Sequence, residues 1–480
     1  MINSNRVLVV LYRYIPEVAP RVFRWGSIVD ELTSQNIDVD VICAALPNTP
    51  EFEIIQKARV FRISPWFKGS YSLDQSRKKT NRPKRYKDFL FFKIFRKRVK
   101  KFLKRLPINS SLQKYGVNFY HKFISILSRV FNNLQLASDN IRRWIGSLSW
   151  PEYGMYWILP AFLKASQLIR QNEYSAVITV SWPVSPHVVG WLIHKTVAKK
   201  PNWIVDIGDP FSFNTTTPIN DFNKFGKLNT RFERSLLKNA TSISVTTCKT
   251  REDYINFLPG IESKIFEIPP LIPKAQNPIE PNLKNLLNDN NQKNKLIFTG
   301  SLRAKNRRPD VILYLFDQVL NDSELKEKLE LHFYGDSKQC LDSFKPYKNI
   351  IDKKIYLHGI VEKSFIDQII NTADFLVNIG NVTENQLPSK TVEYISTNRP
   401  IINISSSKID SSWEIISKTG IGINIYAKGV EEINESDISQ LLNFIKNPPP
   451  PMVDETLKII IEPYSIGVIT NQYKNLIFKK

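Results

Sequence analysis

The chain has 480 residues, of which 42% are hydrophobic and 23% are charged. This composition excludes a disordered chain, and 17 glycines without a period exclude a collagen-like or linker-like architecture. At roughly 150 residues per domain, the length predicts two or three domains with enough chain to bury full hydrophobic cores.

The net charge of +22 is unevenly distributed. Between Lys68 and Arg105, 16 lysines and arginines stand against two acids, which accounts for +14 of that total. Such a segment favours an anionic lipid surface, a nucleic acid or another polyanion as its partner. The rest of the chain has a charge close to that of an ordinary globular protein.

Cysteine usage and hydropathy predict a cytoplasmic protein. The three cysteines are far apart and form no CxxC pair, which favours reduced thiols over a disulfide framework or a zinc site. No apolar run reaches the roughly 18 residues that a membrane-spanning helix needs. The N-terminus lacks a secretory pattern.

The first half of the chain alternates strand and helix patterns, as is typical of a parallel α/β sheet. Strands are expected at residues 6–11, 39–44, 59–63, 176–181, 203–206 and 242–247. Helices are expected over residues 22–32, 160–170 and 225–239. Residues 65–150 interrupt the pattern, because apolar side chains recur there at helical spacing among many lysines and arginines. This predicts a basic helical insertion.

A proline-rich, charge-light stretch then predicts a domain boundary. A second strand–helix series follows, with strands at residues 295–299, 330–334, 354–358, 375–379, 400–404 and 421–425. We therefore expect two Rossmann-like, doubly wound parallel-sheet domains. The expected boundaries are an N-terminal domain over 1–270, a linker over 271–294, a C-terminal domain over 295–450 and a helical segment over 451–480 that packs back on the N-terminal domain.

The first informative loop follows residues 295–299. Gly300 permits close backbone approach, and Arg303, Lys305, Arg307 and Arg308 come directly after it. This composition suits an anionic group such as a diphosphate. The alternative is a tight turn with solvated cations.

The second informative loop precedes a helix opened by Pro388 and Ser389. A helix N-terminus offers amides and a positive dipole to a phosphate, and Lys390 adds a point charge. Glu393 lies one turn later on the same face, where its carboxylate could accept hydrogen bonds from a ribose diol. The alternative is an ordinary capped helix with a solvated glutamate.

These loops resemble the C-terminal domain of the retaining glycosyltransferases of family 4, which have the GT-B fold of two Rossmann-like domains facing a central cleft. The resemblance covers most of the chain except residues 65–145. Its motifs are, by residue number, 14–17 with 24–25, 181–187 (SWPVSPH), 206–210 (DIGDP), 232–234 (FER), 298–302 (FTGSL), 358–359, 373–374, 388–394 (PSKTVEY) and 398–400.

The resemblance implies a donor site in the C-terminal domain. Glu393 would bind the ribose of the nucleotide, Arg307 or Arg308 would bind the donor phosphates, and Lys390 would assist. The family's E-x7-E motif would place a second glutamate at position 385, where this sequence has asparagine, and Glu384 is one residue away. In many relatives that glutamate contacts the donor sugar, and we expect Glu384 to be a catalytic residue in its place.

The N-terminal domain would supply the catalytic and acceptor side. His187 and Asp209 are the expected catalytic residues there, and Glu17 and Asp206 are expected to bind the acceptor. The alternatives are a structural histidine and an Asx-turn cap. The Asp-x-x-Asp pair could also suggest a divalent cation, but the resemblance implies catalysis without a metal and no third ligand lies nearby.

The resemblance implies transfer, with retention, of a hexosyl group from a nucleotide-diphosphate sugar of the UDP or GDP type. The acceptor would be a surface polysaccharide or a glycan on an isoprenoid lipid, and no other cofactor is expected. We expect peripheral attachment to the inner face of the plasma membrane through residues 68–106, where cations and phenylalanines share amphipathic helices. The alternative is that the apolar stripe packs on the protein's own core.

The sequence leaves three other functions open. Asn385 motivates a non-catalytic GT-B-fold protein that assembles other enzymes at the membrane. The basic segment motivates a nucleic-acid binder, but the chain contains no recognisable helix-turn-helix, RRM or zinc module, so no nucleic-acid partner is expected. A nucleotide-sugar epimerase shares the fold.

Overall fold

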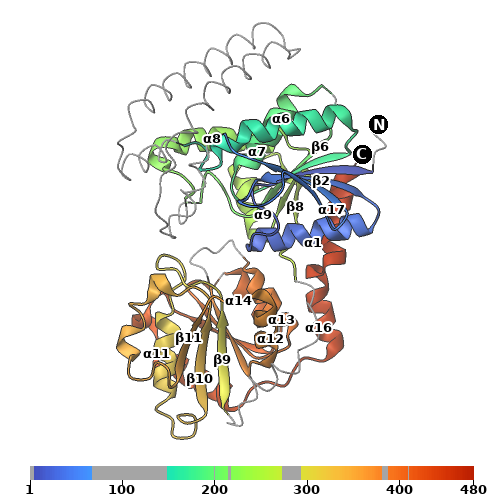
Figure 1. Cartoon of the computed structure of the whole chain (residues 1–480). Helices are drawn as coiled ribbons and strands as arrows, with labels where there is room; N and C mark the ends of the chain where they lie inside the picture. The colour runs from blue at the N-terminus through green and yellow to red at the C-terminus, as the bar shows by residue number, and fades with distance from the viewer. Residues whose placement is uncertain are drawn as a thin grey trace.

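The computed structural model describes residues 5–66, 149–198, 200–214, 218–272, 293–380, 387–408 and 410–479. These residues form two α/β domains stacked one above the other (Figure 1). The basic helical insertion expected over residues 65–150 falls almost entirely outside them.

The N-terminal domain is built on an eight-stranded sheet in the order β3-β4-β2-β1-β5-β6-β7-β8. Its strands are β1 (Arg6–Val10), β2 (Asp38–Ala44), β3 (Phe52–Ile55), β4 (Ala58–Ile63), β5 (Ala176–Val180), β6 (Asn202–Ile207), β7 (Ser242–Val245) and β8 (Ile265–Glu267). All neighbours are parallel except β3 and β4, which form an antiparallel hairpin. The central strands are buried on both faces, so they appear in the sequence as continuous apolar runs.

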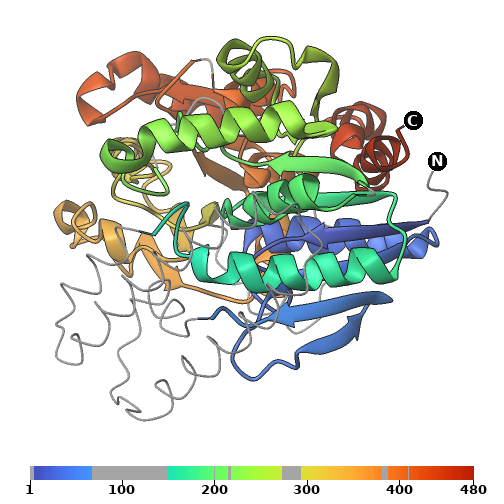
Figure 2. The ribbon, with the colours of Figure 1, turned by 90° about the horizontal axis from the view of Figure 1, so that it is seen from above.

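Helices cover both faces of this sheet. One face carries α6 (Met155–Gln171), α7 (Ser185–Thr196), α8 (Phe222–Asn239) and α9 (Cys248–Phe257). Figure 2 shows α6 and α8 as long helices running across the top of the domain. The opposite face carries α1 (Pro20–Ser34), which begins with proline at its first position and buries Trp25, Ile28, Val29 and Leu32 at helical spacing.

The C-terminal domain has a six-stranded, all-parallel sheet in the order β11-β10-β9-β12-β13-β14. Its strands are β9 (Asn294–Thr299), β10 (Leu329–Tyr334), β11 (Ile355–Gly359), β12 (Phe375–Ile379), β13 (Ile401–Ser405) and β14 (Gly422–Tyr426). Its helices are α11 (Asp310–Val319), α12 (Lys363–Thr372), α13 (Ser389–Ser396), α14 (Ser411–Ser417) and α15 (Glu435–Lys446).

Two final helices connect the domains. Helix α16 (Asp454–Ile461) packs against α13, and α17 (Ile466–Ile477) packs against α1 and β6 of the N-terminal domain. Ile272, at the end of the described part of the N-terminal domain, lies beside this crossing, because its amide donates to the Tyr464 carbonyl over 2.9 Å.

The strand order fixes where ligands are expected. In each sheet the order reverses next to the first strand of the domain, between β1 and β5 and between β9 and β12. Open parallel sheets bind ligands beyond the carboxyl ends of their strands at such switch points.

The strands expected from the sequence are confirmed within a residue or two at their ends, apart from two that were missed. Strand β3 was missed because it is four residues long and alternates exposed with half-buried side chains. Strand β8 was missed because it has only three residues. No helix among the described residues is long and apolar enough to cross a membrane.

Candidate functional site

Two glycine loops meet at the carboxyl ends of β9 and β10. The Gly300 amide donates to the Tyr334 carbonyl over 2.8 Å, and the Leu302 amide donates to the Asp336 carbonyl over 2.9 Å. A Cβ added to Gly335 would lie 2.0 Å from the Gly300 carbonyl oxygen, and both glycines have positive φ, +135° and +145°. Only glycine allows this approach, so the backbone after β9 is fixed by its neighbour.

Tyr394 ties the same loop to helix α13. Its hydroxyl lies 2.9 Å from both the amide and the hydroxyl oxygen of Thr299, the last residue of β9. The ring is fully buried, and burial raises the pKa of Tyr394 to about 12. The second turn of α13 is thereby held against Thr299, directly before Gly300.

Helix α13 carries a partly buried ion pair near its start. Lys390 Nζ lies 2.7 Å from Glu393 Oε2, and Glu393 is only 6% exposed. Pro388 occupies the N-cap position without a side-chain cap, which leaves Ser389 at the first helical position. Glu384 and Asn385 lie outside the described residues, so the expectation for Glu384 stays a prediction.

The structure distinguishes Arg307 from Arg308, which the sequence alone could not do. Arg308 donates to Asp310 over 2.6 and 3.1 Å, to Asp342 over 2.9 Å and to Ser343 over 2.9 Å. Arg307 instead folds over Gly300, with Nη1 3.7 Å from the position that a Gly300 Cβ would take. Burial, aided by Arg303, lowers the pKa of Arg307. A cation in this setting favours an incoming anion.

On the N-terminal side, Glu233 holds the loop that carries Asp209. Glu233 is buried on α8 and accepts from the amides of Phe211 and Ser212 over 3.0 and 2.8 Å, and from the Tyr254 hydroxyl over 2.6 Å. Asp209 follows β6 directly and is partly exposed. The glutamate of the FER motif is therefore a positioning residue for the loop after β6.

His187 lies at the start of α7 and is 4% exposed. Its Nδ1 is 2.9 Å from the Thr179 hydroxyl, which also accepts from Trp203 Nε1 over 3.0 Å. The indole N–H can only donate, whereas the threonine hydroxyl can either donate to Nδ1 or accept from it, so this contact is compatible with both neutral tautomers of the ring. Nε2 has no hydrogen-bond partner among the described residues, and burial lowers the pKa of His187 to about 3. The ring is therefore neutral.

Asp206 is placed in the interior rather than at the rim, at 1% exposure. Its oxygens accept from Trp25 Nε1 over 2.7 Å and from the hydroxyls of Ser244 and Tyr473, each over 2.9 Å, and Arg21 pairs with it at 3.2 Å. Burial would raise the pKa of Asp206, but Arg21, Arg24 and these donors outweigh it and hold the pKa below its usual value. At this burial Asp206 does not reach the surface to contact an acceptor, contrary to the expectation from the sequence. Its hydrogen bonds instead stabilise the core of the N-terminal domain.

Arg21 is the side chain that reaches the surface above Asp206. Its guanidinium rests against Gly208, where an added Cβ would lie 1.1 Å from Nη2. Sequence reasoning missed Arg21 because a single arginine in the first turn of a helix carries no motif. Glu17 lies partly buried in the preceding loop, which Arg62 anchors through the Ile15 carbonyl.

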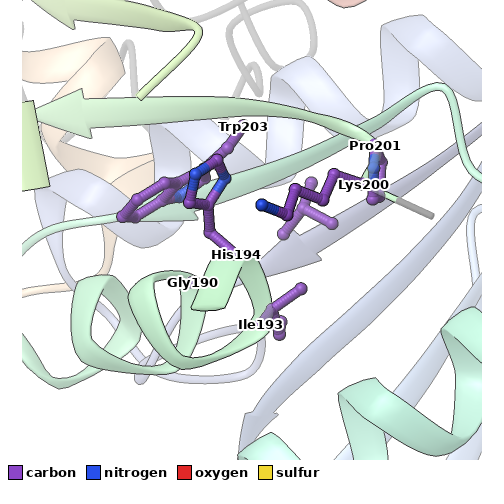
Figure 3. Close-up of a pocket in the computed structure, with 7 residues that line it drawn as sticks. Gly190, Ile193, His194, Lys200, Pro201 and Trp203 are labelled. Carbon is purple, nitrogen blue, oxygen red and sulfur yellow. The ribbon is translucent and has the colours of Figure 1, made fainter. Parts of the chain in front are cut away.

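A small cavity lies elsewhere. It is lined by Val177, Gly190, Ile193, His194, Lys200, Pro201 and Trp203 (Figure 3), at the amino ends of β5 and β6, away from the loops described above. No group of three or more His, Cys, Asp or Glu side chains among the described residues is arranged to hold a metal ion.

Comparisons with known proteins give a fold and no closer relationship. No protein-family model matches the chain, and no curated protein matches it. Solved structures match over nearly the whole length. They include Anabaena HepE in complex with UDP (TM-score 0.56, 11% identity, 98% of each chain). Another is the structure titled trehalose-6-phosphate from E. coli bound with UDP-2-fluoro glucose (0.57, 10%, 99% of each chain). WaaG, a glycosyltransferase involved in lipopolysaccharide biosynthesis, matches with TM-score 0.54 at 10% identity over 99% of this chain and 100% of that one.

The chain has the GT-B fold. The expected fold class is confirmed, while the basic insertion stays a prediction. The Gly300 loop, Arg307 and α13 lie at the carboxyl ends of the C-terminal strands, and His187, the loop of Asp209 and Arg21 lie near the carboxyl ends of the N-terminal strands.

Proposed function

We propose that the protein is a glycosyltransferase that moves a hexosyl group from a nucleotide-diphosphate sugar to an acceptor. The observation that carries the proposal is the convergence of Arg307, the Gly300 backbone and the Lys390–Glu393 pair at the carboxyl ends of β9 and β12. Solved GT-B structures that match the chain are titled as complexes with UDP or a UDP sugar, which supports a UDP-type donor; a GDP-type donor is the alternative.

The chemistry that these residues can perform is stabilisation of the leaving diphosphate. Cations and helix-terminal amides that are already in place when charge develops on the leaving oxygen lower the barrier without reorganisation. Arg307, Lys390 and the amides after β9 and at the start of α13 are suited to this task, and we propose that no metal or further cofactor takes part. Glu393 would accept hydrogen bonds from the ribose once Lys390 turns to the phosphate.

The N-terminal side would handle the sugar and the acceptor. We propose retention of the anomeric configuration, with His187 in its Nε2–H tautomer donating to a substrate oxygen and Asp209 accepting from a hydroxyl group. The acceptor proposed is a surface polysaccharide or a lipid-linked glycan on the cytoplasmic face of the membrane. The participation of WaaG in lipopolysaccharide biosynthesis is a parallel that supports this choice.

A thermal-shift panel with UDP, GDP, ADP and CMP tests the donor site. A ligand at 100 times its Kd adds about 2.7 kcal/mol, which raises Tm by several degrees. We expect a rise with UDP that Glu393→Ala abolishes and the exposed control Glu435→Ala keeps. Release of UDP from UDP-sugars with an added glycan acceptor then tests transfer.

The second candidate is a non-catalytic GT-B protein, favoured by Asn385 at the position of the family's first glutamate. Nucleotide binding without any turnover would select it. A Tm that no nucleotide changes would overturn the transferase proposal.

A further inference from the structure

Helix α8 carries a stripe of cations along its outer face. The stripe consists of Lys224, Lys227, Arg231, Arg234 and Lys238, and all five side chains are exposed. Their spacing of three, four, three and four residues keeps them on one side of an α-helix, opposite the buried side. At 1.5 Å per residue the stripe is about 21 Å long.

The stripe is almost uncompensated by acids. Lys224 lies 3.5 Å from Asp221, while Lys227, Arg231, Arg234 and Lys238 pair with no carboxylate of the described residues. The one acid within the helix, Glu233, is buried and points inward. Like charges at this spacing repel one another within a helix. Binding to an anionic surface would reduce this repulsion between the cations.

The position of α8 separates the stripe from the catalytic site. Helices α6, α7 and α8 form the layer on the side of the N-terminal sheet that faces away from the C-terminal domain (Figures 1 and 2). Trp150 Nε1 donates to Asn229 over 2.9 Å on the buried side of α8, opposite the stripe, so this contact does not cover the cations.

We propose that the α8 stripe is a docking surface for a lipid bilayer that contains anionic headgroups. Leu228, 44% exposed, flanks the stripe and supplies an apolar contact at the headgroup boundary. A straight helix face with cations and an exposed leucine fits a flat anionic surface. A nucleic acid is less suited, because no phenylalanine of α8 is exposed and the neighbouring Phe257 ring is stacked under Arg234 rather than open to a base. The proposal extends the membrane attachment proposed above, and its test does not depend on glycosyl transfer.

Vesicle flotation of the full chain tests the stripe. The variant is Lys227→Glu, Arg231→Glu, Lys238→Glu; Arg234 is left because it stacks on Phe257. The matched control, Lys326→Glu, Lys345→Glu, Lys348→Glu, makes the same charge change at exposed lysines of the C-terminal domain. Each cation near an anionic leaflet contributes about fivefold to binding, so we expect the stripe variant to partition at least tenfold less onto phosphatidylglycerol vesicles and the control to stay within about twofold.

A local probe distinguishes this helix from other basic parts of the chain. In a Cys248→Ser background the two remaining cysteines are buried, so Leu228→Cys can be labelled with an environment-sensitive fluorophore and compared with Lys348→Cys. We expect a blue shift at position 228 with phosphatidylglycerol vesicles and none with phosphatidylcholine vesicles.

Three results would overturn the proposal. The first is equal flotation of the stripe variant and its control, and the second is a label at position 228 that does not respond to anionic vesicles. The third is loss of duplex-DNA binding in the stripe variant while its vesicle binding is unchanged, which would identify the stripe as a nucleic-acid surface.

Discussion

The hydroxyl of Tyr473, in the last helix of the chain, donates a 2.9 Å hydrogen bond to Oδ1 of Asp206 in the sixth strand. The same hydroxyl accepts from Arg24 Nη2 over 3.4 Å, and Arg24 also donates to the carbonyls of Ile268 and Pro269 at the exit from the N-terminal domain. Asp206 is thus the acceptor at which α1, β6 and α17 meet. A carboxylate that looks like a substrate ligand in the sequence is instead the anchor of the chain's return to its first domain.

Removal of the Tyr473 hydroxyl should weaken that anchor. A hydrogen bond to a charged group contributes about 1.5–3 kcal/mol, so we expect Tyr473→Phe to lower the free energy of unfolding of the N-terminal domain by about 2 kcal/mol in urea titrations. Tyr464→Phe is the control, since no described residue hydrogen-bonds its side chain, and it should change stability by less than about 0.5 kcal/mol. Equal effects of the two variants would show that the Asp206 bond does not stabilise the fold.

The two arginines after β9 should behave differently in nucleotide binding. We expect Arg307→Ala to weaken UDP binding by about 10–100-fold, because a charged hydrogen bond to phosphate contributes about 1.5–3 kcal/mol. Arg308→Ala should change UDP affinity by less than about threefold, since its guanidinium is held by Asp310 and Asp342. Isothermal titration calorimetry measures both, and a larger loss in Arg308→Ala would reverse the assignment.

Sequence patterns predicted the fold well because buried parallel strands leave continuous apolar runs and linkers leave prolines. They predicted the site unevenly. Glycine and cation motifs predicted the loop after β9 and the start of α13 as the donor side, since loop chemistry is local, and the fold places these two segments in contact. They could not tell Arg307 from Arg308, because Asp342, the carboxylate that helps to hold Arg308, lies 34 residues away. Asp206 was misjudged for the same reason, since its donors come from α1, β7 and α17.

The Gly335 position should tolerate no side chain. A Cβ there meets the Gly300 carbonyl at 2.0 Å and the backbone cannot yield without moving the loop after β9. We expect Gly335→Ala to cost about 3 kcal/mol or more in unfolding free energy and to abolish the UDP-induced rise in Tm. Gly359→Ala is the control, because its φ of +72° is strained for alanine but its Cβ would meet nothing within 4 Å. It should cost about 1–2 kcal/mol and keep nucleotide binding.

Glu152 should make the stability of the N-terminal domain depend on pH. Its carboxylate is buried and accepts from the amides of Val184 and Ser185 over 3.2 and 3.1 Å and from the Ser185 hydroxyl, at the start of the helix that carries His187. Burial raises the pKa of Glu152 from its usual 4.5 to about 7, although these donors oppose the shift. The folded protein therefore holds a proton that the unfolded chain has released over this interval.

Because the folded protein binds this proton more tightly than the unfolded chain, its stability falls as pH rises. The stabilisation from the protonated carboxyl group is complete below the unfolded pKa near 4.5 and is lost as pH rises to about 7. In urea titrations between pH 4.5 and 8, the unfolding free energy of wild type relative to Glu152→Gln, which is neutral throughout, should fall by up to about 3 kcal/mol. The exposed control Glu51→Gln should give a curve parallel to wild type. A Glu152→Gln curve parallel to wild type would mean that the three donors keep the carboxylate ionised, with a pKa near its usual value.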